Sequence, residues 1–180
     1  FMKFKELPLK ESFLVELEKN TDNRGFFSRL FCDNEFKTIC DFQISQVNNA
    51  FSYDKATLRG IHLQKEPFSE QKLVRCINGE IWDLIIDLRI DSKTFGKWHG
   101  ELLSEKNRKM LFIPKGFGHG YITMKKNSEI IYLVSEKYNP DFEIGIKWND
   151  PFFNIRWPMM PKVLSQKDAS YPNFSSSLLN

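Results

Sequence analysis

Three polar side chains occupy positions where short apolar strands would bury them, and their combined chemistry is that of proton transfer beside a carbonyl group. His62 lies in LRGIHLQ, Lys72 begins KLVRCIN, and Tyr132 lies in EIIYLVS. A neutral histidine accepts a proton at cellular pH, and a lysine held in a dry site stabilises the oxyanion that develops on a ketone. A tyrosine hydroxyl can donate a proton to the opposite face of the planar enolate. The three side chains therefore indicate abstraction of a proton next to a ketone, followed by inversion of that carbon.

Each of these side chains, taken alone, also has a structural explanation. A lysine at a strand end reaches water with its ammonium group, a buried tyrosine bonds a backbone carbonyl, and a buried histidine is often a satisfied core residue. Their coincidence on inward faces of one small barrel favours the catalytic interpretation. Asp168, in LSQKDASYP, is a carboxylate that could orient His62, although chain distance alone leaves their contact open.

The elements that position these side chains are expected to be strands. Apolar residues recur mostly with period two, in short runs separated by Gly, Pro and Asn, which predicts a mainly β protein. The segment KLVRCINGEIWDLIIDLR predicts a hairpin with Asn78-Gly79 as a two-residue type I′ turn. Its register places five side chains on one face: Lys72, Val74, Cys76, Ile81 and Ile85. Further strands are expected at 12–18, 44–51, 57–64, 98–103, 109–113, 119–124 and 128–135.

Alternation within two of these strands gives the candidate residues their neighbours. His62 shares a face with Gly60 and Gln64, and Tyr132 points the same way as Ile130 and Val134. One short helix is expected over 33–40, capped by Asp33 or Asn34, with Phe36, Ile39 and Cys40 facing inward.

Composition indicates one globular domain and excludes several classes of protein. Nine or more short strands in 180 residues, with 17 phenylalanines to fill a core or wide cavity, predict a sandwich or barrel that could enclose one small ligand. The net charge of +3 without a run of like charges argues against a general nucleic-acid binder. Three cysteines without CxxC spacing support neither a disulfide framework nor a cysteine zinc site. No apolar run is long enough to span a membrane and no signal peptide is evident, so a cytoplasmic location is expected. The Ser-rich end, residues 172–180, is expected to fray.

Nearly the whole chain resembles the dTDP-4-dehydrorhamnose 3,5-epimerase family, which consists of cupin-type jelly-roll proteins of nucleotide-sugar metabolism. The resemblance is carried by NRGFFSR, QVNNAFS, LRGIHLQ, KLVRCINGEIWDLIIDLR, TFGKWHGELLS, LFIPKGFGHGYI, IIYLVSEKY, GIKWNDPFFNIRWP and LSQKD. It implies an all-β, cupin-type jelly-roll barrel with few short helices, in which residues 1–180 form a single domain. It also implies an isomerase that needs neither cofactor nor metal. The implied reaction inverts carbons 3 and 5 of a nucleotide-linked 4-keto-6-deoxyhexose, a step in dTDP-rhamnose and cell-surface polysaccharide (lipopolysaccharide) biosynthesis.

Carried over position by position, the resemblance implies His62 as the base, Asp168 as its partner, Lys72 as the enolate-stabilising lysine and Tyr132 as the proton donor. It implies further substrate-binding residues, which are Arg24, Phe27, Arg29, Gln46, Asn48, Arg59, His119, Tyr138, Glu143 and Lys167. The planar guanidinium groups of Arg24 and Arg59 suit a diphosphate. Arg29 stands where the family typically has a glutamate, which reverses a charge beside the expected nucleotide site.

The resemblance further implies a homodimer that exchanges an N-terminal segment, residues 1–30, to which RGFF belongs. The nucleobase, the exact sugar and the number of inverted carbons stay open, so a 3- or 5-monoepimerase or a ketoisomerase is an alternative. A non-catalytic sugar-nucleotide-binding module is another, since it would not need His62, Lys72 and Tyr132 together. A metal-dependent cupin is disfavoured, because Gln64 stands where a second histidine ligand is common and Lys72 would repel a cation.

Overall fold

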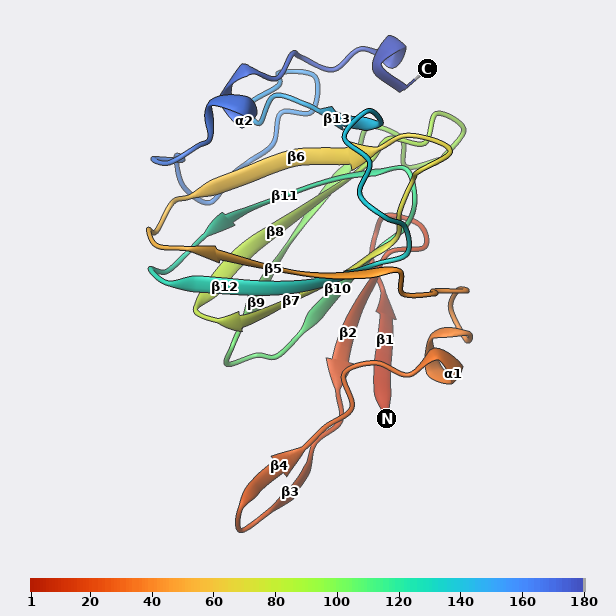
Figure 1. Cartoon of the computed structure of the whole chain (residues 1–180), viewed down its shortest axis with the longest axis vertical. Coiled ribbons are helices and arrows are strands. Elements are labelled where there is room, and N and C mark those ends of the chain that lie inside the picture. Colours follow the sequence, from red (N-terminus) through yellow and green to blue (C-terminus); the bar gives the residue numbers. More distant parts are fainter. Residues whose placement is uncertain (180) are drawn as a thin grey trace.

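Two antiparallel sheets face each other in the computed structural model, in which residues 1–179 are described (Figure 1). The six-stranded sheet has the order β1 (Met2–Glu6), β2 (Phe13–Leu17), β10 (Met110–Ile113), β7 (Lys72–Asn78), β12 (Ser128–Val134) and β5 (Gln46–Ser52). The five-stranded sheet has the order β13 (Glu143–Gly145), β6 (Leu58–Gln64), β11 (Phe117–Thr123), β8 (Glu80–Asp87) and β9 (Trp98–Ser104). The helices are short: α1 (Asp33–Phe36), α2 (Gln166–Ser170) and a 3-10 turn at Ser176–Leu179. The all-β fold expected from the alternation is confirmed.

The predicted hairpin at Asn78-Gly79 is wrong. Strand β7 pairs with β10 and β12, whereas β8 pairs with β11 and β9, so the chain passes from one sheet to the other at this turn. Gly79 still supplies the positive φ, +74°, and Ser128 packs so closely against it that a Cβ would lie 2.6 Å from its Oγ. Local alternation does not identify a strand's partner, and here each strand pairs with two strands of its own sheet.

The predicted common face is nevertheless real, although it spans the space between the two sheets. Val74 and Cys76 on β7 and Ile81 and Ile85 on β8 all belong to the buried cluster that fills the interior. The side chain of Lys72, at the open end of the same face, is 12% exposed. The interior is therefore apolar at its base and carries the candidate polar residues toward one end.

Aromatic side chains cover the outer face of the six-stranded sheet near β2 and β10. Phe36, Phe42 and Phe112 pack with ring centroids 5.5 to 5.9 Å apart. Helix α1 is shorter than expected. Its N-cap is Cys32, not Asp33 or Asn34, and Cys32 makes no side-chain capping hydrogen bond. Asp33 instead accepts a hydrogen bond from the Asn34 amide and pairs with Lys37. Phe36 is buried as expected, and Ile39 and Cys40 pack partly buried beside it.

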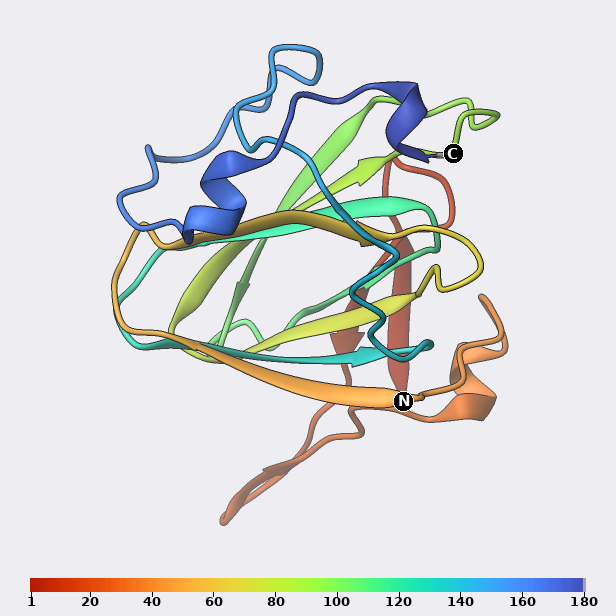
Figure 2. The same ribbon diagram turned by 45° about the horizontal axis from the view of Figure 1, so that its top comes forward.

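Residues 18–30 differ from the rest of the N-terminal region, because the hairpin of β3 (Asn20–Asp22) and β4 (Gly25–Phe27) projects away from both sheets as an arm (Figures 1 and 2). Residues 2–17 instead form β1 and β2 within the chain's own sheet. Of the expected exchange segment, residues 1–30, the arm is the part that lies outside both sheets, and the exchange itself stays a prediction.

The C-terminal residues lie over the outer face of the five-stranded sheet, with α2 above β6 (Figure 2). Phe174 packs against Phe152 and Phe153, and the Pro172 carbonyl accepts a hydrogen bond from the Lys147 amide at 2.9 Å. An aromatic anchor thus follows the helix that carries Asp168, and the fraying expected for 172–180 stays a prediction. Residue 180 lies outside the described residues.

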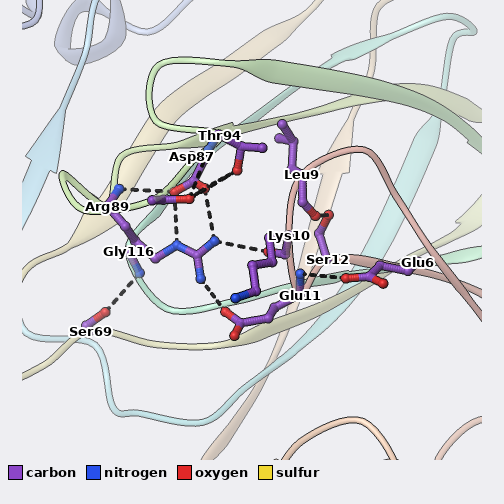
Figure 3. A network of polar contacts seen from close by, with 11 residues as sticks. Glu6, Leu9, Lys10, Glu11, Ser12, Ser69, Asp87, Arg89, Thr94 and Gly116 are labelled. Atoms are coloured by element: carbon purple, nitrogen blue, oxygen red, sulfur yellow. Dashed lines mark hydrogen bonds and ion pairs between the residues drawn. The ribbon is translucent and has the colours of Figure 1, made fainter.

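A buried carboxylate holds the end of β8 to the turn between β1 and β2 (Figure 3). Asp87 is fully buried and accepts hydrogen bonds from Arg89 Nε at 3.0 Å and Nη2 at 2.9 Å, and from the Ser92 and Thr94 hydroxyls at 2.6 Å each. Arg89 also pairs with Glu11 on that turn. Burial would raise the pKa of Asp87, but these hydrogen bonds outweigh it and leave the pKa below its usual 3.8.

Arg89→Met is expected to lower the free energy of unfolding at pH 7 by about 3 kcal/mol, because it leaves the buried Asp87 charge uncompensated. A depressed folded pKa stabilises the fold above the unfolded pKa of about 4, and that stability is lost as the pH falls through the folded value. Urea unfolding at pH 7 and pH 3 should therefore show a smaller loss on acidification in the variant. Lys93→Met on the same loop is the control and should match the wild type; an equal acid loss in Arg89→Met would contradict the prediction.

Candidate active site

A bulge in β6 places two candidate residues on the interior face. His62 pairs with His119 and Arg59 with Tyr121, with a register shift between them. Because residues 119 and 121 share a face of β11, Arg59 and His62 share it too, although they are three residues apart. Gly60 permits the bulge, since a Cβ there would lie 2.6 Å from the Gly120 Cα. The expectation that Gly60 shares a face with His62 is thus wrong, while Gln64 does lie on that side.

His62 is held by Asp168, which settles the contact that the sequence left open. His62 Nε2 lies 2.7 Å from Asp168 Oδ1, and Asp168 Oδ2 accepts a hydrogen bond from the Gly60 amide at 3.3 Å. Ser165 caps α2 by accepting from the Asp168 amide at 2.9 Å. Burial would raise the pKa of Asp168, but its hydrogen bonds with His62 and with the Gly60 amide outweigh it, so the pKa is lowered.

The ionised Asp168 determines which nitrogen of His62 can act as a base. A carboxylate accepts hydrogen bonds only, so Nε2 of the neutral imidazole carries the hydrogen and donates it to Asp168. The other nitrogen, Nδ1, then has the free electron pair. The dyad therefore presents a proton acceptor with a fixed tautomer.

Lys72 is paired with a carboxylate that the sequence analysis did not single out. Its Nζ lies 3.0 Å from Glu70 Oε1, and Glu70 is in turn bonded by Gln64. Gln64 also bonds the carbonyls of Phe68 and Lys137. Glu70 precedes Lys72 by two residues, so strand alternation could have indicated it. The network holds the ammonium in place within a largely buried site.

Tyr132 projects from β12 between Asn48 on β5 and Val74 on β7. Its side chain packs partly buried against the interior cluster. Burial, followed by the negative charge of Glu70, raises the pKa of Tyr132 above its usual value. The phenol therefore keeps its proton at neutral pH and is available as a donor.

His62, Lys72 and Tyr132 together line two cavities of about 340 and 480 Å³. The first, which we call the acidic cavity, adds the carboxylates of Glu70, Glu136 and Glu143. The second, the basic cavity, adds Arg59, Lys167, His119 and Asp168. The imidazole, the ammonium and the phenol therefore lie at the junction of the two cavities, while their catalytic roles stay a prediction.

A second histidine–carboxylate pair stands beside the first. His119 Nε2 lies 2.6 Å from Oδ1 of Asp83, which is fully buried on β8. Asp83 was not among the predicted site residues, although a charged group between Ile81 and Ile85 was a signal for it. Next to it, burial raises the pKa of Tyr121 to about 12, so this hydroxyl is also neutral.

The remaining predicted residues of the main body line one or the other cavity. Tyr138 Oη donates to Glu143 Oε2 at 2.9 Å, and Lys167 pairs with the same carboxylate. Gln46 Nε2 donates to Asn48 Oδ1 at 2.7 Å. Both of these residues line the acidic cavity. Arg59 Nη2 donates to the Phe51 carbonyl at 2.9 Å.

The three predicted residues on or beside the arm line neither cavity of their own chain. Arg24 pairs with Asp22 on the arm, and the side chain of Phe27 is 71% exposed. Arg29 pairs with Glu35 at 2.5 Å. Their role at the site stays a prediction that requires a second copy of the chain.

Within the described part of the chain, no cluster of three or more histidine, cysteine or acidic side chains is arranged to hold a metal ion. None of the helices among residues 1–179 is long and apolar enough to cross a membrane.

Comparison with known proteins gives consistent matches over nearly the whole chain. A family model described as dTDP-4-dehydrorhamnose 3,5-epimerase matches residues 6–176. The dTDP-4-dehydrorhamnose 3,5-epimerase of Sinorhizobium fredii is 41% identical over 174 residues, which are 96% of this chain and 89% of the relative.

Solved structures of the same kind share the fold. The crystal structure of dTDP-4-dehydrorhamnose 3,5-epimerase from Bacillus anthracis, with TDP and PPi bound, has a TM-score of 0.93 at 36% identity and covers 97% of this chain and 100% of that chain. The dTDP-6-deoxy-D-glucose-3,5-epimerase of Legionella pneumophila, in complex with dTDP-4-keto-L-rhamnose, has a TM-score of 0.89 at 33% identity, covering 95% and 92%. These matches confirm the cupin-type jelly roll.

Proposed function

The chain belongs to the dTDP-4-dehydrorhamnose 3,5-epimerase family, and we propose that it inverts carbons 3 and 5 of a dTDP-linked 4-keto-6-deoxyhexose with His62 as the base. The observation that carries the proposal is the junction of the two cavities, where the His62–Asp168 dyad, Lys72 and Tyr132 meet. A sugar-binding module would not require that junction.

The reaction follows from the protonation states of these groups. Nδ1 of His62 takes the proton from the carbon next to the ketone, the C–H electron pair forms the enolate double bond, and the carbonyl electron pair moves to the oxygen at carbon 4. The Lys72 ammonium stabilises that oxyanion. Tyr132 then gives its hydroxyl proton to the other face of the carbon, and the carbonyl re-forms. Water restores the proton of Tyr132 and removes the one on His62, so no cofactor enters the balance.

The distribution of charge supports an orientation for the substrate. The basic cavity, with Arg59 and Lys167, suits the diphosphate, since guanidinium and ammonium groups bind phosphate oxygens. The three carboxylates of the acidic cavity would repel it. The sugar ring is then placed at the junction, where its keto group meets Lys72.

The test is turnover of dTDP-4-dehydro-6-deoxy-D-glucose in heavy water. Each inversion through an exchanging base replaces a carbon-bound hydrogen by solvent deuterium, so the product should carry deuterium at both carbons 3 and 5, as NMR would show. Deuterium at one carbon alone would assign a monoepimerase, and movement of the carbonyl a ketoisomerase. No deuterium at either carbon would rule the mechanism out.

We further propose that the active form is a homodimer in which the arm of one copy reaches the site of the other. The outer face of the six-stranded sheet exposes Val47 (61%) and Ile77 (38%). Beside them, Nε and Nη1 of Arg75 are buried without a hydrogen-bond partner among residues 1–179. An apolar face with an unsatisfied guanidinium suits an isologous contact. Arg24 of the partner subunit would then join Arg59 at the diphosphate.

Complementation between two inactive variants tests this exchange. Arg24→Ala damages the site of the partner, whereas His62→Asn damages its own. Co-expression should restore about one quarter of the wild-type rate, because half of the dimers are mixed and one of their two sites is intact. Each variant expressed alone is the control. Mixed dimers that stay inactive, or a monomer by light scattering, would contradict the arrangement.

A further inference from the structure

On the β13 side of β6, the residue paired with His62 is a glycine, and an aromatic ring occupies the space above it. Gly145 on β13 pairs with His62 on β6. A Cβ at Gly145 would lie 2.1 Å from both Cε1 and Cζ of Tyr171 and 2.3 Å from Cδ1. The Tyr171 ring therefore lies on the backbone of Gly145, and no residue with a side chain could replace this glycine without moving the ring.

The same ring contacts the imidazole of His62. The two ring centroids are 5.6 Å apart with an interplanar angle of 79°, an edge-to-face arrangement. Tyr171 directly follows α2, the helix that carries Asp168. Asp168 and Tyr171, three residues apart in the chain, therefore both contact His62. Asp168 bonds its Nε2 atom, and Tyr171 packs against its ring.

These two contacts restrict different motions of the imidazole. The hydrogen bond from Nε2 to Asp168 fixes one atom of the ring, but the final torsion of a histidine side chain is intrinsically broad. The ring could still tilt about the hydrogen-bonded nitrogen and swing Nδ1 away from the reacting carbon. An aromatic ring packed beside the imidazole and seated on Gly145 opposes that tilt.

We propose that Tyr171, supported by Gly145, is a positioning residue that aims Nδ1 of His62 at the substrate carbon. The proposal rests on the role of His62 as base. Tyr171 lines neither the acidic nor the basic cavity, so its effect falls on the proton-transfer step and not on substrate binding. Both contacts, to Gly145 and to His62, are made by the ring of Tyr171 and not by its hydroxyl.

Tyr171→Ala is expected to lower kcat about 10- to 100-fold, as a misdirected catalytic group does, while KM stays within about twofold. Because proton abstraction becomes slower, the primary isotope effect with substrate deuterated at carbon 5 should rise. Tyr171→Phe retains the ring and should keep the wild-type kcat and isotope effect. A loss of kcat in the Phe variant equal to that in the Ala variant, or a change confined to KM, would overturn the proposal.

The Gly145 contact supplies a second test that does not depend on one substitution. In the wild-type background, Gly145→Ala forces the Tyr171 ring away and should lower kcat. In the Tyr171→Ala background the space is already free, so the same substitution should lower kcat little further. Equal costs in both backgrounds would refute the coupling. Thermal melting of every variant identifies any loss that comes from unfolding alone.

A measurement without substrate keeps this proposal separate from the proposed reaction. NMR of the ¹⁵N-labelled His62 ring should show one sharp Nε2–H tautomer in the wild type and in Tyr171→Phe, and exchange broadening in Tyr171→Ala. An unbroadened ring in Tyr171→Ala would refute the positioning role even if the enzyme is active. Failure of the wild type to turn over any 4-keto sugar would instead refute the function and leave the NMR result standing.

Discussion

Replacing His62 by asparagine is expected to lower kcat for epimerisation by about 10²- to 10⁴-fold, the contribution of a well-placed general base. Asparagine has nearly the same shape and can still donate to Asp168, but it has no nitrogen able to accept a proton at neutral pH. The contacts of Arg59 and Lys167 in the basic cavity are untouched. Affinity for dTDP should therefore stay within about twofold of the wild type.

Two measurements distinguish this loss from a damaged fold. Solvent-deuterium exchange at carbons 3 and 5 should fall in parallel with turnover, and titration calorimetry with dTDP should show retained binding. His99→Asn is the matched control, because His99 lies on β9, pairs with Glu101 at 3.3 Å and lines neither cavity. Exchange that persists at the wild-type rate in the His62 variant would assign the base to another residue.

Replacing Tyr132 by phenylalanine is expected to separate exchange from inversion. His62 can still remove a proton and return one to the same face, so solvent deuterium should enter the substrate without change of configuration. Inversion should fall about 10²- to 10⁴-fold for want of a donor on the other face. Because burial and then the charge of Glu70 raise the pKa of Tyr132, the donor of the wild type stays protonated through the range in which an ordinary tyrosine titrates, and activity should not fall there through loss of its proton.

NMR of recovered substrate and product measures both events in one reaction. Tyr53→Phe serves as the control, because the Tyr53 side chain is 77% exposed and lines neither cavity. Loss of exchange together with inversion would assign Tyr132 to binding or to the enolate instead of the final protonation.

The three residues that meet at the junction of the cavities could be singled out from the sequence because each breaks a local pattern. Lys72 and Tyr132 are polar members of alternating apolar runs, and both line the cavities. The bulge at Gly60 could not be foreseen, since it depends on the close approach of Gly120 on another strand. Strand alternation therefore predicted correctly that His62 and Gln64 share a face, because the strand is regular between them. It predicted wrongly that Gly60 shares that face, because the bulge lies between Gly60 and His62.

Strand partners were the least predictable part of the fold. Asn78-Gly79 has the composition of a tight hairpin, yet β7 and β8 belong to different sheets. Period-two patterns state which side chains point inward, and both strands do contribute to the interior cluster. They do not predict which neighbouring strand a given strand pairs with, because the pairing depends on segments far away in the chain, such as β10 and β11.

The change of sheet at Gly79 bears on how the enzyme reaches its active state during folding. No short-range hairpin joins β7 to β8; β7 bonds β12 and β8 bonds β11, and the His62–Asp168 contact spans 106 residues. Folding that depends on such distant pairings is slow, because the chain loses conformational entropy in closing long loops before the contacts between them can stabilise it. Recovery of turnover after dilution from denaturant should therefore lag behind recovery of the β signal in circular dichroism, and no partly assembled intermediate should carry activity.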